Sequence, residues 1–487
     1  MLFSSITFLF AFLPAILLVY YISPRKLKNT VLMIFSLFFY AWGEPIYVFI
    51  MMFSIIIGYV LGLVTDRYMK AGKKKHARAA VICAVSSNLL ILIYFKYIGF
   101  FVENIMHIIG LKVPEIIIKL PFGIDFSVLS PALPLGISFY TFQILSYSVD
   151  VYRGTVKPQR NIISLAAYVT LFPQLIAGPI VRYETVCDEL DNRRESIDDF
   201  GEGVKRFIVG LGKKVMIANV AGELYSTLSV LSADDNTVLL SWICSIAYTL
   251  QIYFDFSGYS DMAVGLGRMF GFHFLENFNY PYISKSITEF WRRWHISLST
   301  WFRDYVYIPL GGNRNGKWKT IRNIFVVWLL TGFWHGAEWN FIIWGLYYFV
   351  LLMIEKNGLL KKLEKAPKLI QHIYALFFIN IGWVIFSYDN MSSLKHAFAN
   401  MFGMGGLPFI NQKTLFYLAT YGMFLIIACV GTTPLPKKIG EAVIRENGKT
   451  KATLGTLAQL LFLFAVLMIS TAFLASDAFN PFLYFRF

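Results

Sequence analysis

Two histidines lie in the part of the chain where residues able to do acid–base chemistry are concentrated. His295 ends the run WRRWH at 291–295 and His335 lies in GFWHG at 332–336, in a chain of 487 residues with seven histidines. Histidine has the side chain whose ordinary pKa lies nearest neutrality, so it serves as general base and general acid. Burial beside tryptophans such as Trp334 would lower its pKa and keep it neutral, which suits a base. A neutral base next to a hydroxyl group is the minimum requirement for acyl transfer.

Each histidine also has a plainer structural interpretation. His335 would be an aromatic-belt residue satisfied by a backbone carbonyl, but the glycines on both sides of Phe-Trp-His favour catalysis. Beside His295, Arg292 and Arg293 indicate binding of anionic donor groups as readily as proton transfer. We predict a catalytic role for both histidines and leave the division of labour between them open. The sequence has no metal-ligand spacing such as HExxH, so no metal site is predicted.

Ionisable side chains around the histidines are the other functional candidates, because charged groups among apolar segments are expensive to bury. Asp255 and Asp261 lie six positions apart and do not share a helical face. One of them is expected to cap a helix break at Gly258, and the other to face an internal chamber. The predicted supporting residues are Asp255, Asp304, Trp334 and Glu338, and the predicted donor-binding residues are Arg292, Arg293, Arg303 and Arg314.

The composition excludes a soluble domain of this length. Hydrophobic residues make up 57% of the chain and charged residues only 15%. Apolar windows of roughly 17–25 residues, the length that spans a bilayer as a helix, recur along most of the sequence. We count about eleven such windows, together with several that are too short or too broken by proline and glycine to cross simply. The sequence therefore predicts an all-α polytopic membrane protein.

The net charge of +15 does not indicate a nucleic-acid partner, because the cations are dispersed in short linkers and no soluble basic domain presents them. An excess of Lys and Arg in cytoplasmic linkers explains the charge better, and the bilayer itself is the partner this implies. The four cysteines form no CxxC pair, so neither a disulfide framework nor a zinc site is predicted.

The first residues, MLFSSITFLFAFLPAILLVYY, have no basic region before the apolar run, and we interpret them as a retained first span. Arg25, Lys26 and Lys28 follow, which places that end in the cytoplasm and the N-terminus outside. Residues 30–64 are predicted to form a hairpin that breaks at the GEP of 43–45, and four later spans are expected near 338–354, 369–387, 413–433 and 453–475. Without internal repeats or a large extramembrane part, residues 1–487 read as one domain, with a catalytic core at about 130–350 and C-terminal spans at about 369–475.

Two irregular runs need their own interpretation. FPQLIAGPIVR at 172–182 cannot continue a straight helix, and broken backbone at membrane depth is tolerated only inside protein or beside a water-filled cavity, so we predict a re-entrant wall of a chamber. GGNRNGK at 311–317 follows a strand-like VYIPL and matches the start of a P-loop, but Trp318 stands where a magnesium-binding Ser or Thr is required. We predict a Gly-rich cytoplasmic turn there. Residues 109–134 are expected at the outer face and 184–205 as a surface connection.

Several long runs together resemble one family, in the expected order and over essentially the whole chain. They are similar to the membrane-bound O-acyltransferase superfamily, in particular the bacterial branch of the alginate O-acetylation membrane protein. The matching runs are LPLGISFYTFQ at 133–143, FPQLIAGPIVRY at 172–183, YFDFSGYSDMAVGLGRMFGF at 253–272, ENFNYPY at 276–282, FWRRWHISLSTWFRDYVYIPLGGNR at 290–314, GFWHGAEWNFIIWG at 332–345 and NPFLYFRF at 480–487.

The resemblance implies many helices around a central conical chamber, whose thin floor is pierced by a tunnel from a cytoplasmic donor to an outer acceptor. By this resemblance His335 matches the near-universal catalytic histidine and His295 the second histidine of the branch. It implies transfer of an acetyl group from acetyl-CoA, a co-substrate rather than a bound cofactor, across the cell membrane for O-acetylation of an exported or cell-wall polysaccharide. It also implies an extracytoplasmic polysaccharide acetyltransferase as partner protein.

Other functions fit some of the same features. D-alanyl transfer to teichoic acid from a carrier protein shares the FDFSGYSD-like and WHG-like runs, while the greater length and the NPFLYFRF end favour acetylation. A lysophospholipid acyltransferase fits less well, because the resemblance is to the bacterial export branch. A transporter or flippase would explain broken helices and buried charge without acyl transfer, but it would normally show inverted repeats, and we find none.

Overall fold

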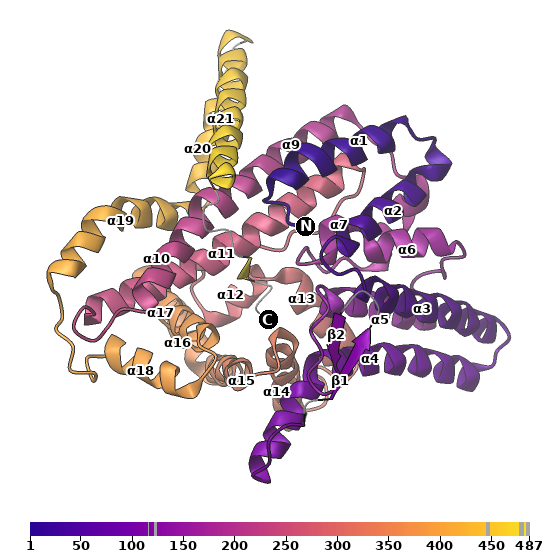
Figure 1. The fold of residues 1–487 in the computed structure, drawn as a ribbon, viewed down its shortest axis with the longest axis horizontal. Helices are drawn as coiled ribbons and strands as arrows, with labels where there is room; N and C mark the ends of the chain where they lie inside the picture. The colour runs from indigo at the N-terminus through magenta and orange to yellow at the C-terminus, as the bar shows by residue number, and fades with distance from the viewer. Residues whose placement is uncertain (115, 121–123, 445–448, 477–481, 484–487) are drawn as a thin grey trace. The chain divides into compact units, whose positions relative to one another are not determined.

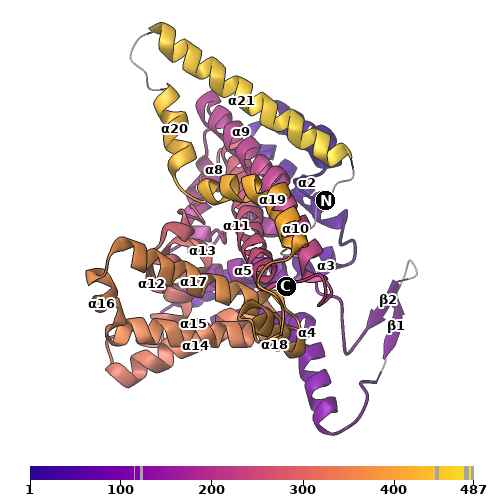
Figure 2. The ribbon, with the colours of Figure 1, turned by 90° about the vertical axis from the view of Figure 1, so that its left-hand side faces the viewer.

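The computed structural model describes residues 1–114, 116–120, 124–444, 449–476 and 482–483. Within these residues the regular secondary structure is helical apart from one antiparallel strand pair, β1 (Ile117–Leu120) and β2 (Ile124–Ser127), which follows α4 (Lys74–Ile108) in Figure 2. The all-α prediction is confirmed with this exception. The hairpin falls in the proline-containing segment 109–134, where the β-branched run of isoleucines at 116–118 favours a strand.

Seven helices among the described residues are long and apolar enough to cross a membrane, and the shorter apolar helix Phe8–Ile22 lies where the first span was predicted. The four later spans are present at the expected positions. Together with the apolar composition, these helices make the chain a multi-pass membrane protein, and the figure of about eleven crossings stays a prediction. The seven helices are Tyr47–Lys70 (α3), Lys74–Ile108 (α4), Val238–Met269 (α11), Trp339–Lys365 (α15 to α16), Lys368–Ser387 (α17), Gln412–Gly431 (α19) and Thr453–Ala475 (in α21).

The chain divides into two compact units, each of which is described by itself. The first comprises Met1–Gly203 and Ala263–Leu275, and the second Val204–Met262 and Glu276–Phe487. The first unit contains the predicted hairpin break, since α2 (Lys28–Ala41) ends before α3 begins at Tyr47. In the broken run at 172–182, α7 (Phe172–Leu175) is a single turn and the backbone after it is irregular and buried, as predicted for a segment enclosed by protein.

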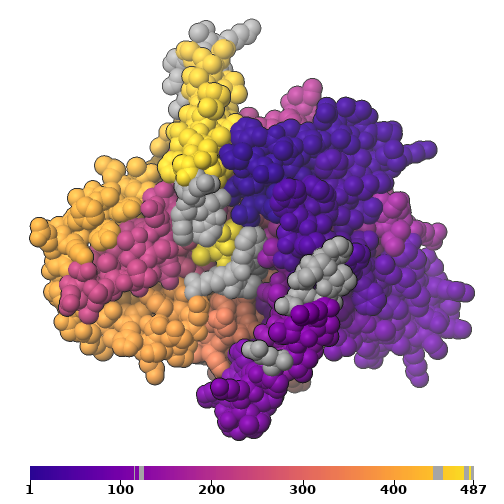
Figure 3. All heavy atoms as spheres, viewed as in Figure 1, coloured from indigo at the N-terminus to yellow at the C-terminus, as the bar shows by residue number. Residues whose placement is uncertain are grey.

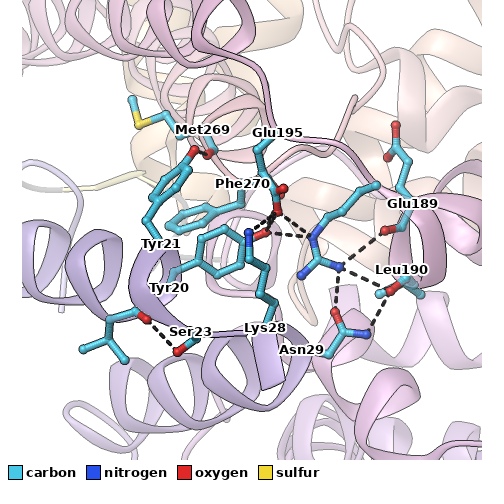
Figure 4. Close-up of polar contacts among 12 residues, drawn as sticks. Tyr20, Tyr21, Ser23, Lys28, Asn29, Glu189, Leu190, Glu195, Met269 and Phe270 are labelled. Carbon is cyan, nitrogen blue, oxygen red and sulfur yellow. Dashed lines mark hydrogen bonds and ion pairs between the residues drawn. The ribbon is translucent and has the colours of Figure 1, made fainter. Parts of the chain in front are cut away.

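A polar cluster ties the first unit together (Figure 4). Arg193 follows α8 (Tyr183–Asn192); its Nε donates to the Tyr20 hydroxyl at 2.8 Å and its Nη1 to Asn29 Oδ1 at 2.7 Å. Glu195 pairs with Lys28 at 2.9 Å and accepts from the Tyr20 hydroxyl. The connection at 184–205 was predicted to lie on the surface. It nevertheless contains a buried arginine, which contacts α1 (Leu13–Ile22) and α2.

The second unit contains both candidate histidines inside an aromatic core. The core is formed by η4 (Lys213–Ala218), α10 (Asn219–Ser229), α12 (Ile287–Arg293), α14 (Lys317–His335) and α18 (Met391–Met401), with spans α11, α15 and α17 (Figure 1). The short helix α13 (Ile296–Phe302) follows α12. By contrast, only 11% and 17% of the apolar windows of α19 and α21 is buried, and Figure 3 shows α21 at the surface. Most of their apolar side chains are exposed, as a lipid-facing span requires.

Two local predictions were wrong. No break occurs at Gly258, because α11 continues from Val238 to Met269. Gly258 instead allows close packing on α9 (Ile197–Gly212), since a Cβ there would lie 2.8 Å from the Gly210 carbonyl oxygen. The strand-like run at 306–310 is helical and turn backbone, beginning in η6 (Arg303–Tyr307). After it, 311–317 forms the predicted turn, held by Asn323 Nδ2, which donates to the Gly312 carbonyl at 2.9 Å.

Candidate active site

His335 lies at the tip of a helical hairpin formed by α14 and α15 (Trp339–Ile354). Glycines let the two helices come together: a Cβ on Gly332 would lie 2.4 Å from the Phe341 carbonyl oxygen, and one on Gly336 would lie 2.2 Å from the Phe341 ring. No real Cβ tolerates such contacts, so the hairpin requires glycine at both positions. The glycines that flank Phe-Trp-His thus have a packing role, and that packing places His335.

Aromatic rings surround the buried imidazole of His335. Its centroid is 5.0 Å from that of Trp334, 5.0 Å from that of Trp344 and 5.2 Å from that of Phe386, each in an edge-to-face arrangement. Edge-to-face contact is the favoured geometry for such pairs. An apolar cage of this kind disfavours the charged imidazolium, so the site suits a neutral base.

His295 joins α12 to α13, where it is only 1% exposed. Its ring lies 4.8 Å from that of Phe256 and 5.7 Å from that of Trp334. Trp334 therefore contacts both His295 and His335, the two candidate catalytic residues of the sequence analysis. His295 lies outside the seven candidate spans, and burial lowers its pKa to about 3, so the imidazole is neutral at physiological pH.

The hydrogen bonds of His295 come from a residue that the sequence reasoning missed. Its Nδ1 lies 3.1 Å from Asn277 Oδ1 and 3.4 Å from Ser297 Oγ. The two carboxylates expected to orient a histidine have other partners: Asp304 pairs with Arg303 at 2.6 Å, and Asp255 with Lys214 at 2.6 Å. Asn277 lies within the run ENFNYPY, which was noted only as part of the family resemblance.

A cavity of about 20 Å³, enough for about one water molecule, lies against His335. Two residues near the end of the chain complete its wall. The Phe482 ring stacks on Tyr259 at 4.7 Å, and the Leu483 N–H donates to Asp255 Oδ2 at 2.9 Å. The other residues of the terminal run at 480–487 lie outside the described residues. The remaining lining residues include Asp255, Phe256, Trp294, Trp383 and Phe386.

Asp255 and Lys214 form a buried ion pair in this wall, between α11 and η4. Each side chain is only 3% exposed, and Nζ lies 2.6 Å from Oδ1. Asp261, further along α11, pairs with Arg206 at 2.9 Å and with Lys213 at 2.6 Å. Both aspartates of the aromatic span are thus neutralised by cations of α9 and η4, as buried charges require.

A second, larger cavity of about 240 Å³ lies among α10, α11, α17 and α18. Its floor includes Tyr248, Val384 and the buried Ser387, and His396 lies on its exposed rim. Tyr248 is one helical turn before Ile252, which lines the small cavity beside His335. The two cavities therefore follow one another along one face of α11.

The predicted donor-binding arginines fall into two groups. Arg293 is tied to Glu289 at 2.9 Å, and Arg303 to Asp304. Arg292 and Arg314 are exposed. The exposed Glu338 precedes α15 as its N-cap residue. Among the described residues, no group of three or more His, Cys, Asp and Glu side chains is arranged to hold a metal ion.

Comparison with known proteins shows the family to which the chain belongs. The model of the membrane-bound O-acyltransferase family matches residues 157–389, which include both histidines. The chain is 41% identical to the probable alginate O-acetylase AlgI of Azotobacter vinelandii, over the full length of both. It is 39% identical to the protein of the same name from Pseudomonas putida, again over both full lengths. With the peptidoglycan O-acetyltransferase of Helicobacter pylori it shares 33% identity, over 84% of this chain and 81% of the relative.

Teichoic acid D-alanyltransferases match over shorter stretches. The Bacillus subtilis enzyme is 33% identical over 52% of this chain and 68% of its own length. The full-length relatives at 41% and 39% identity and the family model agree with the helical architecture. This chain is an O-acyltransferase that belongs to the membrane-bound O-acyltransferase family, in the branch of the alginate O-acetylases.

Proposed function

We propose that the chain passes an acetyl group from cytoplasmic acetyl-CoA across the cell membrane for O-acetylation of an exported or cell-wall polysaccharide. The observation that carries this proposal is the meeting of two buried histidines on Trp334, next to a cavity that holds no more than about one water molecule. Excluding water protects a thioester from hydrolysis. The relatives named as alginate and peptidoglycan O-acetyltransferases support the acetyl group and the polysaccharide acceptor.

In the proposed reaction, the bond between the acetyl carbon and the thioester sulfur breaks and a bond to an acceptor hydroxyl oxygen forms. The hydroxyl proton passes to a histidine and from there to the leaving thiolate, so charge and atoms balance. His335, beside the cavity, is placed to take this proton or to carry the acyl group. His295 assists from its own contact with Trp334, and the exposed Arg292 and Arg314 are available to the phosphates of the donor.

The positions of the basic linkers indicate the direction in which the acetyl group crosses the membrane. Basic linkers precede α17 at 356–368 and follow α19 at 437–438, which favours the cytoplasm for these ends. The 240 Å³ cavity lies at the opposite end of α17, beside Ser387, and would open to the outer side. The same rule, applied to the cations at 25–28, places the N-terminus outside. An extracytoplasmic acetyltransferase remains the proposed partner.

The test uses purified protein in nanodiscs with radiolabelled acetyl-CoA. Loss of a general base typically reduces turnover by roughly 10²–10⁴-fold, which is the expectation for His335→Ala and His295→Ala. His76→Ala is the matched control, because His76 is exposed and far along the chain from the site. Wild-type turnover in His335→Ala would remove that residue from the mechanism.

The same experiment distinguishes acetyl-CoA from the alternative donor, a carrier protein. If the wild-type protein neither hydrolyses acetyl-CoA nor becomes labelled, a carrier protein is the donor and D-alanyl-type transfer takes first place, as the shorter matches to teichoic acid D-alanyltransferases allow. A transporter without acyl transfer does not agree with membership of an O-acyltransferase family.

A further inference from the structure

The backbone of His295 is strained, and a neighbouring segment holds it. The residue has φ 44° and ψ 55°, the left-handed region, which is energetically unfavourable for a residue other than glycine. The Ile296 N–H donates to the Asn277 carbonyl at 3.0 Å, and the Asn279 N–H to the Arg293 carbonyl at 2.9 Å. Strain of this kind persists where the surroundings fix one arrangement, and it is concentrated at functional sites.

The Asn277 side chain determines which nitrogen of His295 carries the proton. Its Oδ1 receives the Ser297 N–H at 3.2 Å, the Ser297 hydroxyl at 2.9 Å and His295 Nδ1 at 3.1 Å. A backbone N–H can only donate, so the atom that faces Ser297 must be the amide oxygen and not the amide nitrogen. The oxygen can only accept, so Nδ1 of His295 carries a hydrogen and Nε2 keeps its lone pair.

The far nitrogen is then available for chemistry. Nε2 of His295 is buried and has no hydrogen-bond partner among the described residues. The same holds for Nδ2 of Asn277. An unpaired buried donor is destabilising, so this asparagine is a poor choice for stability alone. A buried polar group without a partner calls for an explanation, and a catalytic role is one of them.

We propose that Asn277 is a positioning residue of the acyltransferase, which fixes the tautomer and orientation of His295 so that Nε2 is the nitrogen that exchanges protons during transfer. This inference rests on the proposed function for the identity of the reaction, but the hydrogen-bond geometry stands independently of the donor and the acceptor. Ser297 links the arrangement to the first turn of α13, so helix and imidazole are oriented together.

The first experiment reads the tautomer without any substrate. Protein with ¹⁵N-labelled histidine is reconstituted in nanodiscs, and long-range ¹H–¹⁵N correlations distinguish a protonated ring nitrogen from an unprotonated one; His295→Gln identifies the signals of His295. We expect the Nδ1–H form in the wild type and in Asn279→Ala, the matched control with an exposed asparagine in the same segment. Asn277→Ala should give a mixture or the Nε2–H form. An Nε2–H imidazole in the wild type, or no change in Asn277→Ala, overturns the proposal.

The second experiment measures kcat and KM for acetyl-CoA. Asn277→Ala should lower kcat by roughly 10–100-fold, the usual effect of removing a residue that orients a functional histidine, with KM little changed. Asn277→Asp keeps the acceptor oxygen and should recover most of the rate, and its negative charge should move the pH profile of kcat/KM to higher pH. The other titratable or charged groups on the packed elements include His335, the Asp255–Lys214 pair, Tyr253 and Asp261 on α11, Glu276 beside Asn277, and Glu289, Arg292 and Arg293 on α12.

Equal losses in Asn277→Asp and Asn277→Ala, without a pH shift, would assign Asn277 a purely structural role and overturn the proposal. Thermal unfolding of each variant shows whether the protein is folded, and the aspartate variant keeps the test valid if the alanine variant is not. If acetyl-CoA is not turned over by the wild type, the proposed donor fails while the tautomer measurement still decides the role of Asn277.

Discussion

At the scale of single residues, the Lys214–Asp255 pair is the costliest polar feature of the site wall. Both side chains are 3% exposed and lie 2.6 Å apart. Removing one partner leaves a buried charge uncompensated, which typically costs about 3–5 kcal/mol. We therefore expect Lys214→Met and Asp255→Asn each to destabilise strongly, and the double variant to cost much less than their sum. Asn at 255 still offers an oxygen to the Leu483 N–H.

A double-mutant cycle on the free energy of unfolding in detergent measures this coupling. The control is Asp66→Asn, which breaks the exposed Lys70–Asp66 pair at 2.6 Å and should cost less than about 1 kcal/mol. Additive effects at Lys214 and Asp255 would contradict the expected coupling.

Residue types alone predicted both candidate histidines, because a titratable group among tryptophans and glycines is unusual in an apolar chain. They did not predict Asn277, whose partner His295 is 18 positions away. Nor did they predict that Asp255 pairs with Lys214 instead of orienting an imidazole. Hydrogen-bond partners depend on which segments the tertiary structure brings together, and side-chain type does not contain that information.

At the scale of elements, α12 is held at the end opposite His295 by one carboxylate. Glu355, which is 1% exposed, follows α15, and it accepts from Ile287 N at 2.6 Å, from Thr288 N at 2.8 Å and from the Thr288 hydroxyl at 2.6 Å. A negative charge at a helix N-terminus is also favoured by the helix dipole. Glu355→Ala leaves one buried and one partly buried backbone donor unpaired, which costs about 1–3 kcal/mol for the buried one and less for the other.

We expect Glu355→Ala to lower the thermal midpoint and to speed hydrogen exchange in residues 287–295, and Glu355→Gln to have an intermediate effect. Ser286→Ala is the control: its hydroxyl accepts from Glu289 N at 3.0 Å at the same helix end, and a single cap of this kind is worth about 1 kcal/mol. Equal exchange rates in wild type and Glu355→Ala would show that α12 does not depend on this carboxylate.

The elements themselves were predictable where a long apolar window leaves few choices, as for α17 and α19. Prediction failed where a glycine is required by packing between helices and not by a turn. Gly258 was interpreted as a helix break, but α11 is unbroken there and Gly258 allows close packing against Gly210. The strand pair after α4 was missed because proline and low charge in that segment outweighed its isoleucine run.

At the scale of the whole molecule, stability should depend on pH through a group outside the spans. His273 follows α11, with Nδ1 2.8 Å from Glu189 and Nε2 3.4 Å from Asp199. The hydrogen bond to Glu189 raises the pKa of His273 above its ordinary value, although burial opposes this. A hydrogen bond from Ser196 lowers the pKa of Asp199, so that carboxylate stays charged near neutral pH.

Because the pKa of His273 is higher in the folded than in the unfolded protein, its contribution to stability is complete below the ordinary histidine pKa and is lost as pH rises through the raised value. We expect the thermal midpoint of the wild type to fall as the pH rises above the ordinary histidine pKa of about 6.5, and the difference between wild type and His273→Gln to shrink over the same interval. The effect should be small, because His273 is half exposed and solvent screens such pairs. His76→Gln, at an exposed position in the first turn of α4, is the control and should leave the slope unchanged. A difference between wild type and His273→Gln that stays constant with pH would mean that the ion pairs of His273 do not couple its protonation to folding.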